Sequence, residues 1–423
     1  MRAKIYAGAE YTGNPDMHVG QVHRMLPQGV NLGNKRIAAA RAALTLRTGL
    51  DMFPRQSNKH RMHEWSRRFL LLPGTFRCSN SRKKGCMKID IFCHIVPQNY
   101  YDRMLKLPET GTTIKRRTAN IPAMVNLEAR FRFMDRFAEY CQVVSMAAPP
   151  IEAMGDTKLS PELAQLANDG LAELVVKHPD RFPGFVAALP MNNPAAAVEE
   201  VDRAVLKLGA VGVQMFSNVN GRPLDEPDFL PIFEKIAERN VPIWLHPSRS
   251  SNFADYATEK KSKFELWWVF GWPYETSVAM GRILFAGYFD RFPELKIIAH
   301  HLGAMIPYFS GRTGAGLDQL GARTEEEDLA LVGRKLKKRP QDYFKMFYAD
   351  TATFGSLPAL RCGLEYFGAD KVLFASDSPF DPEKGPGYIR ETIRCVEGVE
   401  MSAEDRHKIY EGNARKLMRL KLA

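Results

Sequence analysis

Eight short apolar runs, rich in Val, Ile, Leu and Phe, recur along the chain from Met87 onward. Buried strands of parallel sheets have continuous apolar sequences of this kind, so each run is predicted to form a strand. The eight predicted strands are Met87–Cys93, Tyr140–Ser145, Gly184–Leu189, Ala210–Phe216, Val241–Leu245, Leu295–His300, Met346–Ala349 and Lys371–Ser376.

Segments with helical spacing of apolar residues separate the runs. Ser160 is the predicted N-cap of one helix, with Pro161 at its first position, and Asn193 caps another over Pro194–Leu208. Asp225–Arg239 is a third helix candidate. Eight strands alternating with helices over about 330 residues predict an α/β fold, a (β/α)₈ TIM barrel. A doubly wound open sheet is the rival architecture, but the chain has no Gly-rich phosphate loop to support it.

Two of the predicted connections are long, Ile95–Glu139 after the first strand and Pro247–Glu294 after the fifth. Barrel enzymes build their sites from the loops at the C-terminal ends of the strands. These two insertions are therefore expected to shape the active site.

The net charge of +11 is unevenly distributed. Residues 1–86 contain 16 Lys and Arg against 4 Asp and Glu, whereas the remaining 337 residues contain 43 against 44. We therefore predict two parts, a basic and disordered N-terminal extension (1–86) and the barrel (87–423). The extension could be sequence upstream of a natural start at Met87, an organelle transit segment or a polyanion-binding arm.

The composition, with 45% hydrophobic and 25% charged residues, is that of an ordinary globular protein. No apolar stretch approaches the roughly 18 residues needed to span a bilayer, so no membrane association is expected. The six cysteines are scattered, which favours free thiols in a reducing compartment, and the protein is predicted to be cytoplasmic.

Ionisable residues follow four of the apolar runs, at His94, His246, His301 and Asp377. The first and eighth strands of a closed barrel are neighbours, so His94 and Asp377 should meet, with His246 reaching the same mouth from across it. Neutral imidazole and carboxylate groups suit Zn²⁺, Mn²⁺ or Fe²⁺. The pattern thus predicts a metal site, although a lone histidine at a strand end is more often structural.

Four segments, in order, carry a family resemblance: IDIFCHIVP, PIWLHP, KIIAHHLGAMIPYFSGR and FASDSPFDP. The chain from about Met87 to Leu420 resembles the second amidohydrolase family, which includes aminocarboxymuconate semialdehyde and resorcylate-type decarboxylases and related hydrolases. The resemblance implies a barrel with one divalent metal, usually zinc or manganese. It also implies that His94, His246 and Asp377 are metal ligands and that His301, six residues before Pro307, is the catalytic histidine.

Phe92 departs from the family pattern, which commonly places a histidine or glutamate ligand two residues before the His94 position. Three outcomes are open: a His–His–Asp site with more water ligands, a replacement ligand such as His300, or a site poor in metal. The first is our prediction, because two histidines and a carboxylate can still hold a divalent ion.

The second insertion contains candidate substrate-binding residues. Arg249 could pair with a substrate carboxylate or with a neighbouring acid, because a guanidinium matches both. Trp268, with Trp267 and Trp272 beside it, could line an aromatic wall or pack the core of the insertion. Asp350, at the end of the seventh strand, is interpreted as a helix cap rather than a partner of the site.

We predict a metal-dependent nonoxidative decarboxylase of a small aromatic or muconate-like carboxylic acid. His301 and Asp377 are its catalytic residues, and its cofactor is one divalent metal, Zn²⁺ first and Mn²⁺ second. A hydrolase of a lactone, ester or amide on the same site is the first alternative, and a catalytically inactive binding barrel is the second. The expected partners are the small carboxylic acid and a second copy in a homodimer, with no nucleic acid or membrane.

Overall fold

The computed structural model describes residues 86–107, 116, 119–324 and 329–420. The predicted basic extension, residues 1–86, lies outside this described part except for Cys86. Five of the six cysteines lie in the described part: Cys86, Cys93, Cys141, Cys362 and Cys395. All five are free thiols, as predicted. None of the described helices is long and apolar enough to cross a bilayer.

Eight parallel strands form the centre of the described part, and each of the eight predicted runs overlaps one of them. In order around the sheet they are β1 (Lys88–Ile95), β2 (Tyr140–Met146), β3 (Gly184–Ala188), β4 (Gly212–Phe216), β7 (Ile243–His246), β8 (Ile297–Ala299), β9 (Tyr348–Asp350) and β10 (Val372–Leu373). A parallel bridge between Cys93 and Ser378, with the Ile91 amide donating to the Phe374 carbonyl, brings β1 against the segment around β10. The (β/α)₈ barrel is therefore confirmed and the open doubly wound sheet is rejected.

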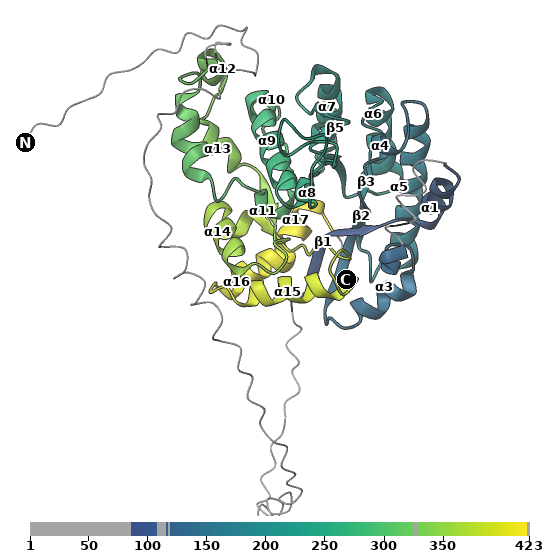
Figure 1. Cartoon of the computed structure of the whole chain (residues 1–423). Coiled ribbons are helices and arrows are strands. Elements are labelled where there is room, and N and C mark those ends of the chain that lie inside the picture. The colour runs from purple at the N-terminus through teal and green to yellow at the C-terminus, as the bar shows by residue number, and fades with distance from the viewer. Residues whose placement is uncertain (1–85, 108–115, 117–118, 325–328, 421–423) are drawn as a thin grey trace, which may run out of the picture. The chain divides into compact units, whose positions relative to one another are not determined.

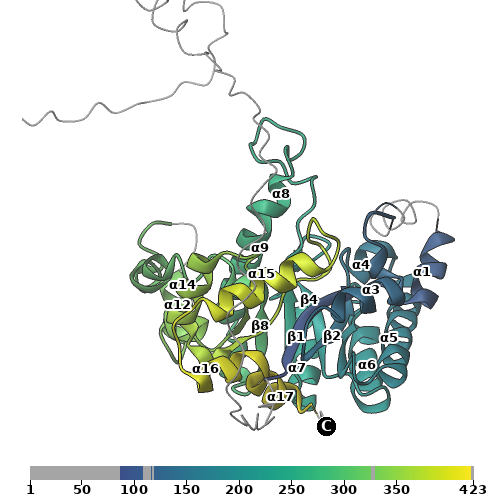
Figure 2. The same ribbon diagram turned by 90° about the horizontal axis from the view of Figure 1, so that it is seen from below.

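Helices surround the strands, and the colours in Figures 1 and 2 run around the barrel so that β1 lies beside the C-terminal elements. Over the described residues the helices are α1 (Gln98–Leu105), α3 (Leu127–Met134), α4 (Ile151–Met154), α5 (Leu159–Lys177), α6 (Pro194–Asp202), α7 (Leu230–Arg239), α8 (Leu266–Val269), α9 (Gly271–Phe285), α10 (Tyr288–Arg291), α11 (His300–Gly303), α12 (Leu329–Lys335), α13 (Pro340–Phe344), α14 (Leu357–Phe367), α15 (Pro386–Glu397), α16 (Ala403–His407) and α17 (Asn413–Met418). A short antiparallel pair, β5 (Asn218–Val219) and β6 (Arg222–Pro223), follows β4.

The predicted helix starts are partly right. Asn193 caps α6 as predicted, because its side chain accepts a hydrogen bond from the Ala196 amide. Ser160 is not a cap, since α5 already begins at Leu159 and the Asp156 carboxylate accepts from the first amides instead. The third candidate begins with a short 3₁₀ turn and becomes α7 only at Leu230.

The barrel interior is filled by apolar side chains of the strands, including Ile91, Phe92 and Trp244, all of them buried. A register shift between Asp90 and Cys93 marks a β-bulge in β1. The bulge lets two successive residues, Ile91 and Phe92, join this interior cluster, although strand side chains normally alternate. The Trp244 indole N–H donates to the Ile91 carbonyl at 2.9 Å, which satisfies a backbone group released by the bulge.

Candidate functional site

Three histidines from distant parts of the chain meet at the C-terminal ends of the barrel strands. His94 belongs to β1, His246 is the last residue of β7, and His300 directly follows β8. One ring nitrogen from each lies within 4.8 Å of those of the other two, and all three residues are buried. His94 and His246 therefore converge as predicted, and His300 lies in the same cluster.

Asp377, in the loop after β10, brings the carboxylate of the site. Its Oδ1 lies 3.1 Å from Nε2 of His94 and 3.5 Å from Nε2 of His300. Its Oδ2 lies 3.6 Å from Nε2 of His301. The structure thus places the predicted ligand His94, the predicted catalytic histidine His301 and the neighbouring His300 around one carboxylate.

Hydrogen bonds on the far side of each ring decide which nitrogen faces the centre. Nδ1 of His94 is 3.1 Å from the Met146 carbonyl, and Nδ1 of His246 is 2.8 Å from the Pro247 carbonyl. Because a carbonyl can only accept, both rings carry their proton on Nδ1 and leave the Nε2 lone pair available. Nδ1 of His300 is bonded in the same way to Asp350.

The atoms facing the centre lack protein hydrogen-bond partners. They include Nε2 of His94, Nε2 of His300 and Oδ1 of Asp377, all of which are buried. Buried polar atoms are rarely left unpaired, so several of them around one point indicate a bound group. Imidazole nitrogens with lone pairs and a carboxylate, each oriented by a second hydrogen bond, are the donor set expected for a divalent metal ion.

The electrostatics of the cluster agree with this reading. Burial, together with the nearby imidazoles of His94 and His300, holds the pKa of His246 well below its usual value. Burial would raise the pKa of Asp377, but the surrounding imidazoles hold it well below the usual range. The site therefore presents a neutral imidazole and an ionised carboxylate, which are the protonation states that metal coordination requires.

His300 and His301 differ in their protonation. Burial alone would lower the pKa of His300, but the Asp350 and Asp377 carboxylates raise it to about 9, so a metal ion bound at its Nε2 would have to displace a proton. Burial and the neighbouring His300 lower the pKa of His301. His301 therefore releases a proton more readily than a solvent-exposed histidine does.

The turn that carries His301 has an unusual backbone. His301 and Leu302 both adopt left-handed conformations, with φ of 55° and 57°, although neither is glycine. The Asp350 carboxylate accepts hydrogen bonds from both of their amides, at 3.2 and 3.1 Å. Asp350 therefore holds the turn and also orients His300, so it is a partner of the site and not the helix cap we expected, because no side chain caps α11.

Phe92 fills the place on β1 where the resembled family has a ligand. Its ring stacks on the His300 imidazole with centroids 3.7 Å apart and planes 11° apart. The ring of His246 lies 6.4 Å away on another side. Phe92 therefore packs directly behind His300 and fixes one face of its ring.

The two predicted substrate-binding residues both have acidic partners within the second insertion. The Arg249 guanidinium donates to the Glu275 carboxylate at 2.8 Å, so the salt-bridge alternative is present in the structure. The Trp268 indole N–H donates to Glu265 at 3.1 Å. The ring of Trp272 lies 5.6 Å from that of His246.

Arg130 is a contributor that the sequence analysis missed. Its buried guanidinium donates to the His94 carbonyl, to the Ala123 carbonyl and to the Gln142 side chain. It therefore fixes the strand end that carries His94. Its position on α3, remote in sequence from every strand-end motif, gave no signal that could have identified it.

The comparisons with known proteins agree on one family. The amidohydrolase profile matches residues 89–420. Gamma-resorcylate decarboxylase of Polaromonas sp. is 35% identical over 302 residues, 69% of this chain and 87% of that protein. 2-Amino-3-carboxymuconate-6-semialdehyde decarboxylase of Dictyostelium discoideum is 28% identical over 344 residues, 78% and 90% of the two chains. The crystal structure of a dihydroxybenzoic acid decarboxylase from Polaromonas sp., with bound manganese and 2-nitroresorcinol, is 28% identical with a TM-score of 0.62, covering 80% of this chain and 98% of that one.

Proposed function

Because this chain belongs to the amidohydrolase family, we propose that it catalyses the nonoxidative decarboxylation of a small aromatic or muconate-like carboxylic acid. The support is twofold. The similar proteins named above are decarboxylases of such acids, and the histidine and carboxylate cluster has the composition of a metal site. The second observation carries the proposal, since an intact site separates an enzyme from an inactive barrel.

One divalent ion would be held by His94, His246 and Asp377, with His300 as a further ligand. The orphaned nitrogens and the Asp377 oxygen fit such an ion. Zinc is our first choice, because imidazole nitrogen in place of an oxygen ligand favours zinc over manganese. Manganese, which the Polaromonas structure contains, is the second choice.

A divalent ion, when bound, draws negative charge from a substrate oxygen next to the departing carboxylate. The chain's own part is to move the proton. The bond between the ring carbon and the carboxylate breaks, CO₂ leaves, and the ring carbon takes a proton in its place. His301 is the proposed donor, since it lies beside Asp377; it gives the proton as the cationic imidazolium and regains one from water after each turnover.

CO₂ release tests the proposal directly. The purified protein, loaded with zinc or with manganese, would be assayed against hydroxybenzoates and carboxymuconates and, in parallel, against lactones, esters and amides. We expect CO₂ only from the first panel, and turnover confined to the second would replace decarboxylation with hydrolysis. His301→Ala should lose about 10²- to 10⁴-fold of the activity, the typical contribution of a positioned proton donor. Equal rates in the wild type and this variant would remove His301 from the reaction, and an absence of turnover with both panels would point to an inactive barrel.

A further inference from the structure

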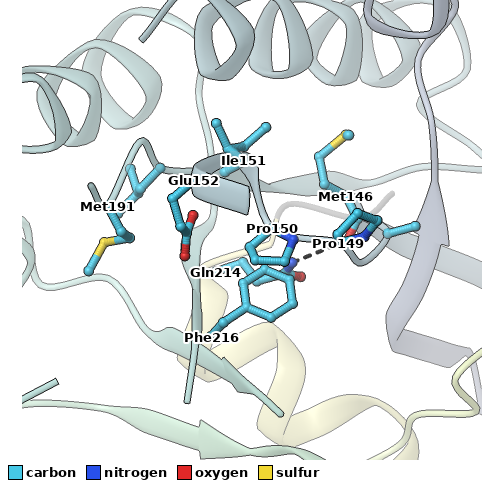
Figure 3. A pocket seen from close by; sticks show the side chains of 11 residues that line it. Met146, Pro149, Pro150, Ile151, Glu152, Met191, Gln214 and Phe216 are labelled. Carbon is cyan, nitrogen blue, oxygen red and sulfur yellow. Dashed lines mark hydrogen bonds between the residues drawn. The ribbon is translucent and has the colours of Figure 1, made fainter. Parts of the chain in front are cut away.

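A small cavity lies at the ends of β2, β3 and β4 (Figure 3). Apolar side chains such as Met146, Leu189 and Phe216 form most of its wall, and Glu152 and Gln214 are its polar members. Its volume is about 10 Å³. That is room for one group the size of a water molecule.

Two polar atoms of this cavity have no hydrogen-bond partner, Oε1 of Glu152 and Oε1 of Gln214. Both side chains are 3% exposed, so bulk water does not satisfy these atoms. The Gln214 amide is oriented, because its Nε2 donates to the Met146 carbonyl at 3.1 Å. Two unpaired acceptors in one apolar pocket are unusual, since buried polar groups almost always have partners.

The same Met146 carbonyl connects the cavity to the histidines. It accepts from Gln214 on one side and from Nδ1 of His94 on the other. Phe216, another wall residue, has its ring 4.8 Å from that of His246. A ligand held at the histidine cluster would therefore lie next to this cavity.

Burial raises the pKa of Glu152 to about 8. No cation contributes to this shift, and the carboxyl is mainly protonated at pH 7. A neutral carboxyl can donate one hydrogen bond and accept others, whereas Gln214 Oε1 only accepts. The pair is thus suited to a small neutral group that donates a hydrogen bond and can also accept one.

We propose that this cavity receives a hydroxyl or amino substituent of the substrate and that Glu152 and Gln214 select for it. The inference rests on the proposed function, because it takes the substrate to be the acid held at the histidine cluster. An apolar substituent of the same size would leave both oxygens unpaired. A single trapped water is the competing occupant, and it would give no selectivity among substrates.

Matched pairs of ligands test the inference. Salicylates with a hydroxyl group at ring position 3, 4, 5 or 6 would be compared with those carrying a methyl group at the same position. A site built to bond a hydroxyl discriminates strongly against its absence, so the wild type should prefer the hydroxyl at one position at least ~10-fold in kcat/KM. Gln214→Leu and Glu152→Leu should each reduce this ratio ~10-fold or more, while Glu152→Gln, which still donates and accepts, should retain most of it.

Met191→Leu, a change in the apolar wall of the same cavity, is the matched control and should leave the ratio unchanged. A wild type without preference at any position overturns the inference, and so do leucine variants that slow both members of each pair equally. The wild-type ratio decides alone if a leucine variant does not fold. Dissociation constants of the same ligands from calorimetry separate the two proposals. A binding preference without CO₂ release would support the selective cavity and refute the decarboxylation. CO₂ release without a binding preference would support the decarboxylation and refute the selective cavity.

Discussion

The proposal that His300 replaces the ligand missing at Phe92 can be tested by returning a ligand to that position. In the structure, the His300 imidazole lies among the other donor atoms, and the Phe92 ring stacks behind it at 3.7 Å. We expect His300→Ala to lose metal. Adding Phe92→His to that variant should restore metal, because it returns an imidazole to β1 beside His94.

The expected magnitude follows from the number of ligands. Structural zinc sites with four protein ligands bind with roughly 10–16 kcal/mol, or about 2.5–4 kcal/mol for each ligand. At 1.36 kcal/mol for each factor of ten, the loss of His300 should weaken zinc binding roughly 10²- to 10³-fold. The double variant should recover to within about tenfold of the wild type, since a new ligand is less well oriented without a partner such as Asp350.

Zinc competition against a chromophoric chelator measures the affinity without any need for turnover. His301→Ala is the matched control, since it removes a neighbouring imidazole that we assign to proton transfer and should change the zinc affinity little. The reasoning fails if His300→Ala binds zinc as tightly as the wild type. It also fails if His301→Ala weakens binding as much as His300→Ala does. A melting curve of each metal-free protein shows whether a loss of affinity comes from unfolding.

Three further predictions concern the surroundings of the site. Asp350→Asn removes the carboxylate that orients His300, and zinc affinity should fall 10- to 100-fold in the same competition assay. Burial raises the pKa of Glu152 from its ordinary 4.5 to about 8 in the folded protein, so the stability linked to its protonation should be lost as pH rises from 4.5 to 8. The loss in free energy of unfolding is roughly 3–5 kcal/mol. Urea unfolding at pH 5, 7 and 9 should therefore show the stability of Glu152→Gln rising relative to that of the wild type by about this amount as the pH increases. Phe264 and Phe270 are 88% and 70% exposed around α8, and we expect them to bury in a homodimer, so replacing both with serine should yield monomers in sedimentation velocity.

The fold was predictable because its determinants are local in sequence. Every strand of the barrel is buried on both faces, so each one appears as an apolar run that needs no knowledge of its neighbours. Helix starts depend on single side chains and were less predictable. Serine is a favoured N-cap residue, but the Ser160 hydroxyl donates a hydrogen bond to Asn192 instead. The Asp156 carboxylate accepts the hydrogen bond from the first backbone amide of α5.

The site was predictable only as far as strand ends determine it. His94, His246 and Asp377 follow strands, and a closed barrel must bring such residues to one mouth. The sequence analysis favoured a site without a replacement for the ligand missing at Phe92. The stacking of Phe92 on His300 depends on the bulge in β1, and a bulge leaves no mark in the hydrophobic pattern.

Backbone conformation explains why two adjacent histidines take different roles. A strand or helix would point His300 and His301 in separate directions, but the left-handed turn stacks their rings with centroids 3.8 Å apart. Asp377, with φ of 64°, also lies in the left-handed region, and such conformations cost about 1–3 kcal/mol each. They persist because Asp350 holds the amides of the turn and the Asp377 amide donates to the Phe92 carbonyl. Three of the twelve non-glycine residues with positive φ in the described part are thus His301, Leu302 and Asp377, and strain at such positions is expected where geometry serves chemistry rather than stability.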